Sequence, residues 1–490
     1  MLFNSPLFLV FFISVFGFYF GIPQRFRWLI LLIASCFFYM AFIPVYILIL
    51  VAVIIIDFFA GIEIEKSVGK KKRFFLLLSI FSNIGILFVF KYFNFFHANF
   101  DALAHLLHWN YSLPTLSLLL PIGLSFHTFQ SLSYIIEVYR GNQKAEKHFG
   151  IYALYVMFFP QLVAGPIERP QNLLPQFHNP KEFNASRAVS GLRLMLFGFF
   201  KKIVIADNAA ILVNFVYARS HESAGWPLIL ATFFFAWQIY GDFSGYSDVA
   251  RGAARVFGFE LMKNFDRPYF SKSISEFWRR WHISLSTWFK DYVYIPLGGS
   301  RAGKYKQYRN LFLTFLLSGL WHGANWTFVV WGSLNGLYLV FSLITQNIRQ
   351  RFHDFFHADH FVLLKGIFQT LCTFGLICIS WIFFRATTLS ESIAILTHLG
   401  HRFTAIFSLS YVRYELLVEK TIGINKQTFV ITLVSIFLLI GIEYSIGQKK
   451  LFPWFERLPR AGKWGLYYAG VLIILWCGYF GNLPFIYFQF

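Results

Sequence analysis

Long apolar runs alternate with short polar segments along the whole chain. An α-helix needs about 20 apolar residues to cross the hydrocarbon core of a bilayer, and runs near this length recur. They predict about eleven membrane-crossing helices, over residues 6–20, 28–40, 45–59, 74–90, 116–138, 192–217, 228–240, 311–344, 362–384, 429–442 and 465–479. Residues 152–163 are too short to cross, and we expect them to form a re-entrant segment.

Composition and charge agree with an all-α polytopic membrane protein. Of the 490 residues, 57% are hydrophobic and 13% are charged, whereas soluble domains carry about 25% charged residues. The net charge of +20 could suggest nucleic-acid binding. However, Lys and Arg gather in short segments between apolar runs, which is the positive-inside pattern of membrane proteins. No linker or repeat divides the chain, so we expect one integral domain over residues 1–490.

The segment 251–309 interrupts the apolar pattern and is expected to be interfacial or re-entrant. Within it, residues 273–290 place aromatic and charged side chains at helical spacing, which predicts a single amphipathic helix. Ser273 and Glu276 have the spacing of a capping box at its start. His282 lies inside this predicted helix. It is either a group that assists catalysis or an interfacial residue with one hydrated edge.

His322 lies between two apolar runs, in the sequence S-G-L-W-H-G-A-N-W of residues 318–326. An imidazole at membrane depth is costly unless it has a partner or lines a cavity, so such a residue is a candidate functional group. Small neighbours leave room for a ligand, while Trp321 could enclose it. Asn325 and His282 could orient a substrate or stabilise charge. The alternative is a buried histidine satisfied by a neighbouring helix.

Two further polar clusters interrupt apolar runs. Asp242, Ser244 and Tyr246 could line a cytoplasmic opening, although a helix end with satisfied polar groups is the preferred interpretation of this cluster. Ser244 lacks the G-x-S-x-G context of a serine nucleophile. His127 and Gln130 fall inside a predicted span and could border a tunnel.

Several other residues suggest chemistry less strongly. Lys201 and Lys202 are expected to extend to the cytoplasmic surface, or else to bind an anionic group. His353, His357 and His360 have a spacing that metal ligands can share, but no fourth soft ligand follows. The four cysteines show no C-x-x-C pairing, so we predict no metal site.

Three motifs resemble the membrane-bound O-acyltransferase (MBOAT) family: F-W-R-R-W-H-I-S at 277–284, D-F-S-G-Y-S-D at 242–248 and L-W-H-G-A-N at 320–325. Shorter motifs extend the similarity over essentially the whole chain, including L-P-I-G-L-S-F at 120–126 and F-I-Y-F-Q-F at 485–490. The chain looks most like the bacterial branch that contains the alginate O-acetyltransferase membrane subunit. Where that branch is expected to read F-Y-x-F-E, this chain has F-H-T-F-Q at 126–130.

The resemblance implies a ring of about eleven transmembrane helices, with re-entrant and interfacial helices, around a central tunnel. It implies that His322 is catalytic and that His282 is the second family-typical histidine. Substrate would contact Trp278 and Arg279, together with the further residues named above: Trp321, Asn325, Asp242, Ser244, Tyr246, His127 and Gln130. The acyl donor would be acetyl-CoA or another acyl thioester, with no permanently bound cofactor.

The predicted function is O-acylation, most simply O-acetylation, of an extracytoplasmic polysaccharide such as an alginate-like polymer or peptidoglycan. The expected setting is the bacterial inner membrane, with a periplasmic acetyltransferase as partner. Two alternatives stay open: acyl transfer of the teichoic-acid D-alanylation type, and a non-enzymatic transporter or flippase. An acyltransferase consumes its donor, whereas a transporter moves its substrate unchanged.

Overall fold

The computed structural model is helical throughout its regular secondary structure, over the residues that it describes: 1, 3–109, 111, 113–163, 165–301, 303–355, 362–400, 419–481, 483 and 485–486. The helices form two compact units. Unit 1 comprises Met1–Met195 and Tyr246–Lys263, and unit 2 comprises Leu196–Gly245 and Asn264–Phe490. Helices α10 (Ala185–Phe199) and α12 (Trp226–Phe257) each contribute residues to both units.

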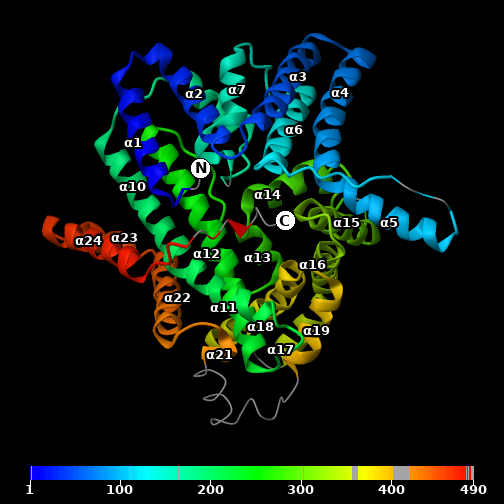
Figure 1. Ribbon diagram of the computed structural model, residues 1–490, viewed down its shortest axis with the longest axis vertical. Coiled ribbons are helices and arrows are strands. Elements are labelled where there is room, and N and C mark those ends of the chain that lie inside the picture. The colour runs from blue at the N-terminus through cyan, green and yellow to red at the C-terminus, as the bar shows by residue number, and fades with distance from the viewer. Residues whose placement is uncertain are drawn as a thin grey trace. The chain divides into compact units, whose positions relative to one another are not determined.

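Unit 1 is built from the N-terminal helices (Figure 1). Besides parts of α10 and α12 it contains α1 (Pro6–Gly21), α2 (Arg27–Met40), α3 (Ile47–Lys66), α4 (Gly69–Leu87), α5 (Phe93–Leu106), α6 (Leu124–Arg140), α7 (Phe149–Met157), α8 (Phe159–Leu162) and α9 (Pro170–His178). Helices α3, α4 and α6 pack against one another. The short helices α7 and α8 occupy the predicted re-entrant segment, and their break at Phe158 precedes Pro160.

A buried carboxylate ties α3 to α4. Asp57 on α3 accepts hydrogen bonds from the Ser79 hydroxyl at 2.5 Å and from the Asn83 amide at 3.0 Å, both on α4. A buried polar group is costly unless it is hydrogen-bonded, so these donors are what make an aspartate tolerable in an apolar helix. The helix pair is therefore held in register by a polar contact inside an otherwise apolar interface.

The prediction of a continuous span over residues 116–138 was wrong at its N-terminal side. Residues 116–121 form no helix, and α6 begins at Leu124. Gly123, with a φ of 77°, precedes the helix in the left-handed region that glycine adopts most readily. Apolar composition alone does not distinguish an extended apolar segment from a helix, because both bury the same side chains.

Unit 2 contains the C-terminal half of the chain (Figure 1). After the π-helical segment η4 (Phe200–Ala206) come α11 (Asp207–Tyr217), α13 (Ile274–Arg280), α14 (Ile283–Phe289), α15 (Lys304–His322), α16 (Trp326–Ile344), α17 (Gln346–Phe355), α18 (Val362–Arg385), α19 (Leu389–Leu399), α21 (Glu419–Ile422), α22 (Lys426–Gly447), α23 (Leu451–Arg457) and α24 (Arg460–Cys477). Helix α16 packs against both α15 and α18.

Two glycines allow α15 and α16 to pack closely. A Cβ atom on Gly319 would lie 2.3 Å from the Phe328 carbonyl oxygen, and one on Gly332 would lie 2.4 Å from the Phe315 carbonyl oxygen. Membrane helices commonly use small residues to bring their backbones together. The close approach fixes the end of α15, where His322 is the last residue.

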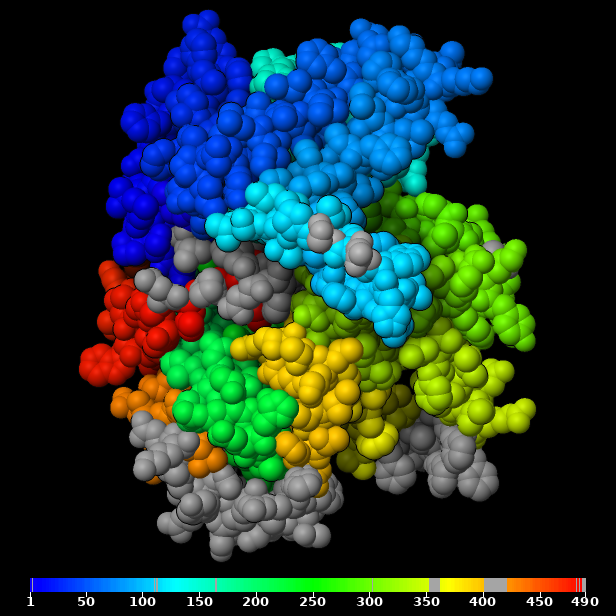
Figure 2. All heavy atoms as spheres, turned by 45° about the vertical axis from the view of Figure 1, so that its right-hand side comes forward, coloured from blue at the N-terminus to red at the C-terminus, as the bar shows by residue number. Residues whose placement is uncertain are grey.

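Among the described residues, five helical segments are long and apolar enough to cross a membrane: Pro44–Lys66, Gly69–Leu106, Trp326–Ile344, Val362–Arg385 and Lys426–Gly447. Between 17% and 39% of the most apolar stretch of each is buried, so much of it is open to the surroundings, and Figure 2 shows α3 and α4 in blue at the surface. Pro6–Gly21 and Leu389–Leu399 are shorter apolar helices. The number of eleven crossings stays a prediction.

Replacing Gly319 with alanine should destabilise the α15–α16 pair. The new methyl group would overlap a backbone carbonyl, and overpacking of this kind costs about 1–3 kcal/mol. We expect Gly319→Ala to lower the thermal unfolding midpoint of the detergent-purified protein. Gly375→Ala on α18 is the matched control, because its Cβ meets no atom within 4 Å. Equal midpoints for the two variants would contradict the close packing.

Candidate active site

His322 is buried among aromatic rings at the end of α15. It is only 5% exposed. Its ring centroid lies 4.9 Å from that of Trp331 on α16 and 5.3 Å from that of Phe384 on α18, both at steep angles. Trp321, the preceding residue, lies 4.9 Å away. The imidazole therefore occupies an apolar enclosure in which a proton transfer would be shielded from water.

Helix α15 ends at His322, and the neighbouring residues explain why. Gly323 is extended, and a Cβ on it would lie 2.2 Å from the Phe328 ring. Asn325 then caps α16: its side-chain oxygen accepts from the Thr327 N–H at 3.0 Å, and its amide donates to the Thr387 carbonyl at 2.8 Å. Both polar groups of Asn325 thus have structural partners. Its predicted contact with substrate stays untested.

The structure contradicts the single helix predicted over residues 273–290. The capping box at its start is confirmed, since the Ser273 hydroxyl accepts from the Glu276 N–H at 3.1 Å. However, α13 ends at Arg280, and α14 begins at Ile283. His282 lies between them in the left-handed region, with φ 44° and ψ 56°. Such a conformation is uncommon for a side chain other than glycine and recurs at functional sites.

Asn264 accepts the hydrogen bonds that stabilise this break between α13 and α14. Its backbone carbonyl accepts from the Ile283 N–H at 2.9 Å. Its side-chain Oδ1 accepts from the Ser284 N–H at 3.2 Å and from the Ser284 hydroxyl at 2.8 Å. His282 Nδ1 lies 3.2 Å from the same oxygen. The non-helical segment at Asn264 therefore supplies the acceptors that the Ile283 and Ser284 N–H groups would otherwise find within a helix.

These contacts determine the protonation of His282. A backbone N–H can only donate, so the Asn264 atom that faces Ser284 must be the amide oxygen. His282 Nδ1 must then carry the proton that it shares with this oxygen, which leaves a lone pair on Nε2. Burial lowers the pKa of His282 to about 3, so the ring is neutral at physiological pH. A neutral imidazole of fixed tautomer can accept a proton at Nε2.

The two candidate histidines lie against the same indole ring. The centroid of Trp321 is 6.5 Å from that of His282 and 4.9 Å from that of His322. Trp278 belongs to the same cluster, because it is buried and lies 5.7 Å from Trp331. Arg279, by contrast, is exposed on α13. The structure thus brings His282, His322, Trp278 and Trp321 together and leaves Arg279 outside this cluster.

Asp242 is part of a buried ion cluster. Lys202 Nζ lies 2.7 Å from Asp242 Oδ1 and 2.8 Å from Asp207 Oδ1, and all three side chains are almost completely buried. The prediction that Lys202 extends to the aqueous surface was therefore wrong, and its alternative, binding of an anionic group, is what the structure contains. Lys202 lies in η4, and π-helical segments are frequent at functional sites.

The ion cluster is linked to the His282 region through neighbouring residues. Asp242 Oδ2 accepts the backbone N–H of Ile486 at 2.7 Å. Phe243, the next residue after Asp242, lies 4.6 Å from the His282 ring and 5.7 Å from Phe485. Segments far apart in sequence therefore meet beside His282. Ser244, two residues after Asp242 in the same motif, is buried on α12.

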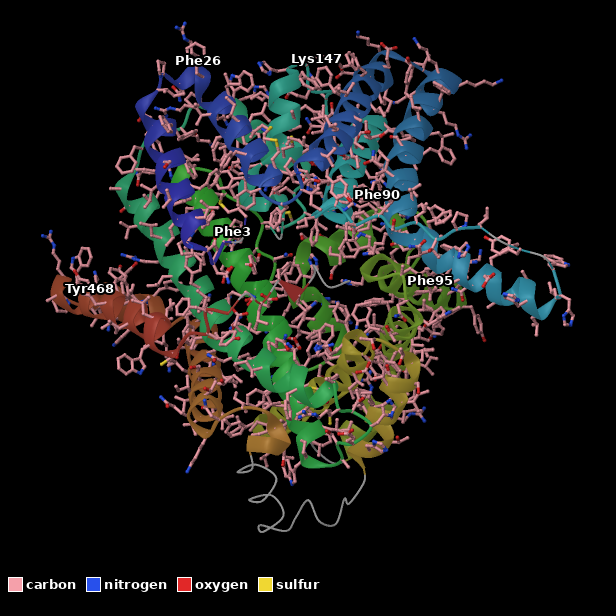
Figure 3. The ribbon with its side chains drawn as sticks, viewed as in Figure 1. Phe3, Phe26, Phe90, Phe95, Lys147 and Tyr468 are labelled. Atoms are coloured by element: carbon pink, nitrogen blue, oxygen red, sulfur yellow. The ribbon has the colours of Figure 1, made fainter. Side chains whose placement is uncertain are left out.

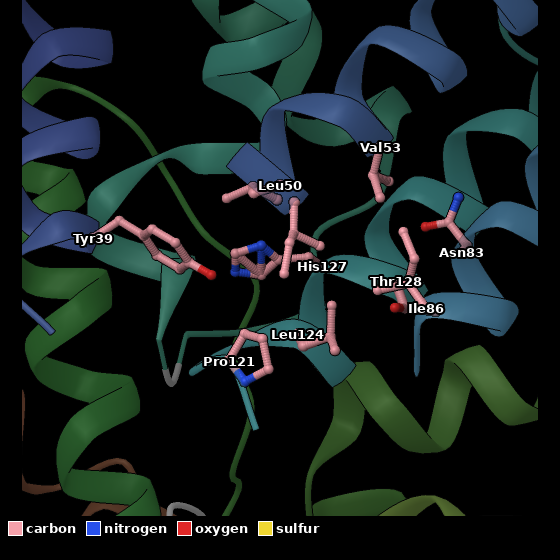
Figure 4. A pocket seen from close by; sticks show the side chains of 10 residues that line it. Tyr39, Leu50, Val53, Asn83, Ile86, Pro121, Leu124, His127 and Thr128 are labelled. Carbon is pink, nitrogen blue, oxygen red and sulfur yellow. The ribbon is translucent and has the colours of Figure 1, made fainter. Parts of the chain in front are cut away.

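Three of the predicted site residues belong to unit 1. His127 Nε2 lies 3.1 Å from the Leu162 carbonyl, and Gln130 donates to the Tyr155 carbonyl. His127 also lines a small pocket, with the Tyr39 hydroxyl directed toward its ring (Figure 4). The Tyr246 hydroxyl lies 3.4 Å from Asn4 Oδ1. Their predicted contact with substrate stays untested.

The structure describes only part of the histidine-rich segment that was considered as a metal site. Within the ranges that the structure describes, no three His, Cys, Asp or Glu residues are grouped as metal ligands. His357, His360 and the side chain of His353 lie outside those ranges. That the chain has no metal site stays a prediction.

Sequence reasoning missed the residues that position the two histidines. Asn264 lies in a polar segment without a recognised motif, and the tertiary contact to His282 has no local signal. Trp331, Trp381 and Phe384 build the wall around His322, with Trp331 and Trp381 stacked at 6.0 Å. An aromatic residue in an apolar helix is ordinary core by composition, so its place at a site emerges only from the fold.

Comparisons with known proteins identify the family. The model of the membrane-bound O-acyltransferase family matches residues 148–384, which include both histidines. The chain is 40% identical over 394 residues to the probable alginate O-acetylase AlgI of Pseudomonas putida, covering 79% of this chain and 78% of the relative. It is 36% identical over 431 residues to the peptidoglycan O-acetyltransferase of Helicobacter pylori, covering 81% and 79%.

A more distant similarity covers about half of each chain. The teichoic acid D-alanyltransferase of Bacillus subtilis is 30% identical over 223 residues, which are 43% of this chain and 56% of that protein. The chain belongs to the membrane-bound O-acyltransferase family, and it is an O-acyltransferase with several membrane-crossing helices.

Removing the Asn264 side chain should release His282 from its position. Asn264→Ala leaves the Ser284 N–H and the His282 Nδ1–H without their acceptor, at about 1–3 kcal/mol for each stranded buried donor. Ser284→Ala is the control, because it removes one donor and leaves the amide oxygen with two. Thermal unfolding and acyl transfer should both suffer much more in Asn264→Ala. Equal losses in the two variants would contradict the role of the Asn264 amide oxygen as the shared acceptor, or hub, for Ser284 and His282.

The ion cluster predicts an ordered series of stabilities. Lys202→Met leaves two buried carboxylates without a cation and should cost about 3–5 kcal/mol. Asp207→Asn should cost less, because Lys202 still pairs with Asp242 and the cluster becomes neutral. Expression and thermal unfolding of the two variants measure this difference. A larger loss for Asp207→Asn would show that Lys202 does not balance both carboxylates.

Proposed function

We propose that this protein transfers an acetyl group from a cytoplasmic thioester to an extracytoplasmic polysaccharide, either an alginate-like polymer or peptidoglycan. The relatives that cover about four fifths of the chain are named for O-acetylation of these two polymers. The observation that carries the proposal is the pair of buried histidines whose rings both lie near Trp321, at centroid distances of 6.5 Å for His282 and 4.9 Å for His322. Both histidines come from motifs that resemble those of the family.

His322 is assigned the role of general base. The acceptor hydroxyl gives its proton to the His322 imidazole while its oxygen attacks the thioester carbonyl. The carbon–sulfur bond then breaks, and the thiolate takes this proton from His322 to leave as the thiol. The apolar rings around His322 exclude water that would hydrolyse the thioester. The attacking hydroxyl belongs either to the polymer or to a partner protein that passes the acetyl group on.

His282 is assigned an orienting or charge-stabilising role. Asn264 fixes its tautomer and ring direction, and the backbone at His282 is held in an uncommon conformation. A preorganised group of this kind contributes by not having to reorganise during the reaction. Its contact with Trp321 places it one ring away from His322.

The remaining parts of the proposal concern the setting of the reaction. About eleven membrane-crossing helices would form a ring around a tunnel, with the donor entering from the cytoplasm and acetyl-CoA as the simplest donor. The location would be the bacterial inner membrane. An extracytoplasmic acetyltransferase would complete transfer to the polymer, because a long polysaccharide needs a binding surface outside the membrane.

A second candidate function is D-alanyl transfer to teichoic acid. It uses the same chemistry, since an aminoacyl thioester and an acetyl thioester present the same carbonyl to a hydroxyl. The similarity to the Bacillus subtilis protein supports it over less than half of the chain, which favours acetyl transfer. A transporter or flippase would leave the acyl donor intact, so donor consumption separates it from both enzymatic functions.

His322→Ala should abolish acetyl transfer while leaving a folded protein, because the rings of Trp331 and Phe384 that enclose the site stay in place on α16 and α18. We expect at least a hundredfold loss, in line with the removal of a general base. The measurement is release of free thiol from labelled acetyl-CoA by nanodisc-reconstituted protein, with the extracytoplasmic partner present.

His282→Ala and the exposed His178→Ala complete the series. His282→Ala should reduce the rate less than His322→Ala, and His178→Ala should leave it unchanged. Wild-type turnover in His322→Ala would overturn the assignment of the base. Equal loss at both buried histidines would mean that they act as one coupled pair.

A further inference from the structure

A cationic cavity of about 380 Å³ lies in unit 1 and contains none of the residues assigned to acyl transfer. Its charged lining comes from Arg25 in the α1–α2 connection, from Arg27 at the start of α2, and from Lys181 after α9. Tyr19, Trp28 and Phe259 form aromatic walls. None of the described residues that line the cavity carries a carboxylate. Glu146, close by in the chain to the lining residue His148, accepts from the His178 ring at 2.7 Å.

Two cations of this cavity, Arg27 and Lys181, interact with a backbone carbonyl or with aromatic rings. Arg27 donates to the backbone carbonyl of Lys181, and its guanidinium lies 5.3 Å from the Tyr19 ring centroid. Lys181 Nζ lies 5.4 Å from the Phe259 ring. Burial, followed by repulsion from Arg187, lowers the pKa of Lys181. Cations gathered in this way, without a lining carboxylate, would be stabilised by a bound anion.

The surroundings of the cavity point to a lipid as the source of that anion. Phe26 of the α1–α2 connection and Lys147 lie at the same end of unit 1 (Figure 3). Beside the cavity, α1 and α2 expose the apolar side chains of Phe18, Leu29 and Ile33, and Phe26 is exposed between them. Tryptophan and tyrosine are typical of the membrane interface, and basic pockets between membrane helices bind anionic headgroups.

We propose that this cavity binds the phosphate headgroup of an anionic phospholipid, with the acyl chains lying along the exposed faces of α1 and α2. The phosphate oxygens would accept from Arg25 and Lys181, and the apolar surface of the two helices would cover the upper part of the acyl chains. The proposal is independent of the acyl-transfer assignment, because it involves neither His282 nor His322.

The test is native mass spectrometry of the full-length protein in detergent with three added compounds. These are dioctanoyl phosphatidylglycerol, dioctanoyl phosphatidylcholine and sn-glycerol 3-phosphate. The variant Arg25→Gln/Lys181→Gln removes two cavity charges and leaves Arg27, which holds the backbone. Lys70→Gln/Arg73→Gln is the matched control, because it removes two exposed charges of α4 that do not line the cavity.

We expect phosphatidylglycerol to bind wild type and the control alike, and to bind the cavity variant at least about tenfold more weakly. Equal loss in both variants would overturn the proposal by showing attraction to net charge alone. Equal binding of phosphatidylcholine would overturn the anionic specificity. Binding of glycerol 3-phosphate as tight as that of the lipid would overturn the lipid as the source. The wild-type comparison of the three compounds stands even if the cavity variant fails to fold.

Discussion

One amide oxygen, that of Asn264, fixes the turn from which His282 meets Trp321. Three donors converge on it: the Ser284 N–H, the Ser284 hydroxyl and the His282 ring. Together with the Asn264 backbone carbonyl, this oxygen supplies acceptors for the N–H groups of residues 283 and 284, so the chain can turn at His282. The hub thus determines at once the backbone conformation, the tautomer and the ring direction of His282.

His322 is positioned by the packing of helices and aromatic rings rather than by a shared hydrogen-bond acceptor. Close approach of α15 and α16 at Gly319 and Gly332 brings the end of α15 against the aromatic wall of α16 and α18. In an apolar protein, each buried polar group needs a specific partner or a reason to be uncharged. The Asp57 contacts in α3 and the Lys202 ion cluster satisfy this requirement elsewhere in the chain. At His282 the same requirement is met by the Asn264 oxygen, which holds the neutral ring in one tautomer.

Much of this architecture could be predicted from the sequence, and the limits have physical causes. Apolar runs revealed a helical membrane protein, and the capping box at Ser273 was confirmed because it is a local interaction. The helix break at His282 could not be predicted, since the hydrogen bonds that stabilise it come from Asn264, 18 residues away. Lys202 was misassigned because its burial could not be predicted: Asp207 is near in sequence, but the second counter-charge, Asp242, is brought to it only by the fold. Recognised motifs located His282 and His322, and only the fold showed that both contact Trp321.

The most direct test of the central claim is an experimental structure of the protein in nanodiscs with a non-hydrolysable acetyl-thioester analogue. The account predicts that the acyl carbonyl lies in the space bordered by Trp321, within reach of an oxygen nucleophile that is hydrogen-bonded to His322. Reacting atoms in such a complex should be about 3–3.5 Å apart. An acyl group bound where neither His322 nor His282 can reach its carbonyl would contradict the assignment of this cluster as the active site.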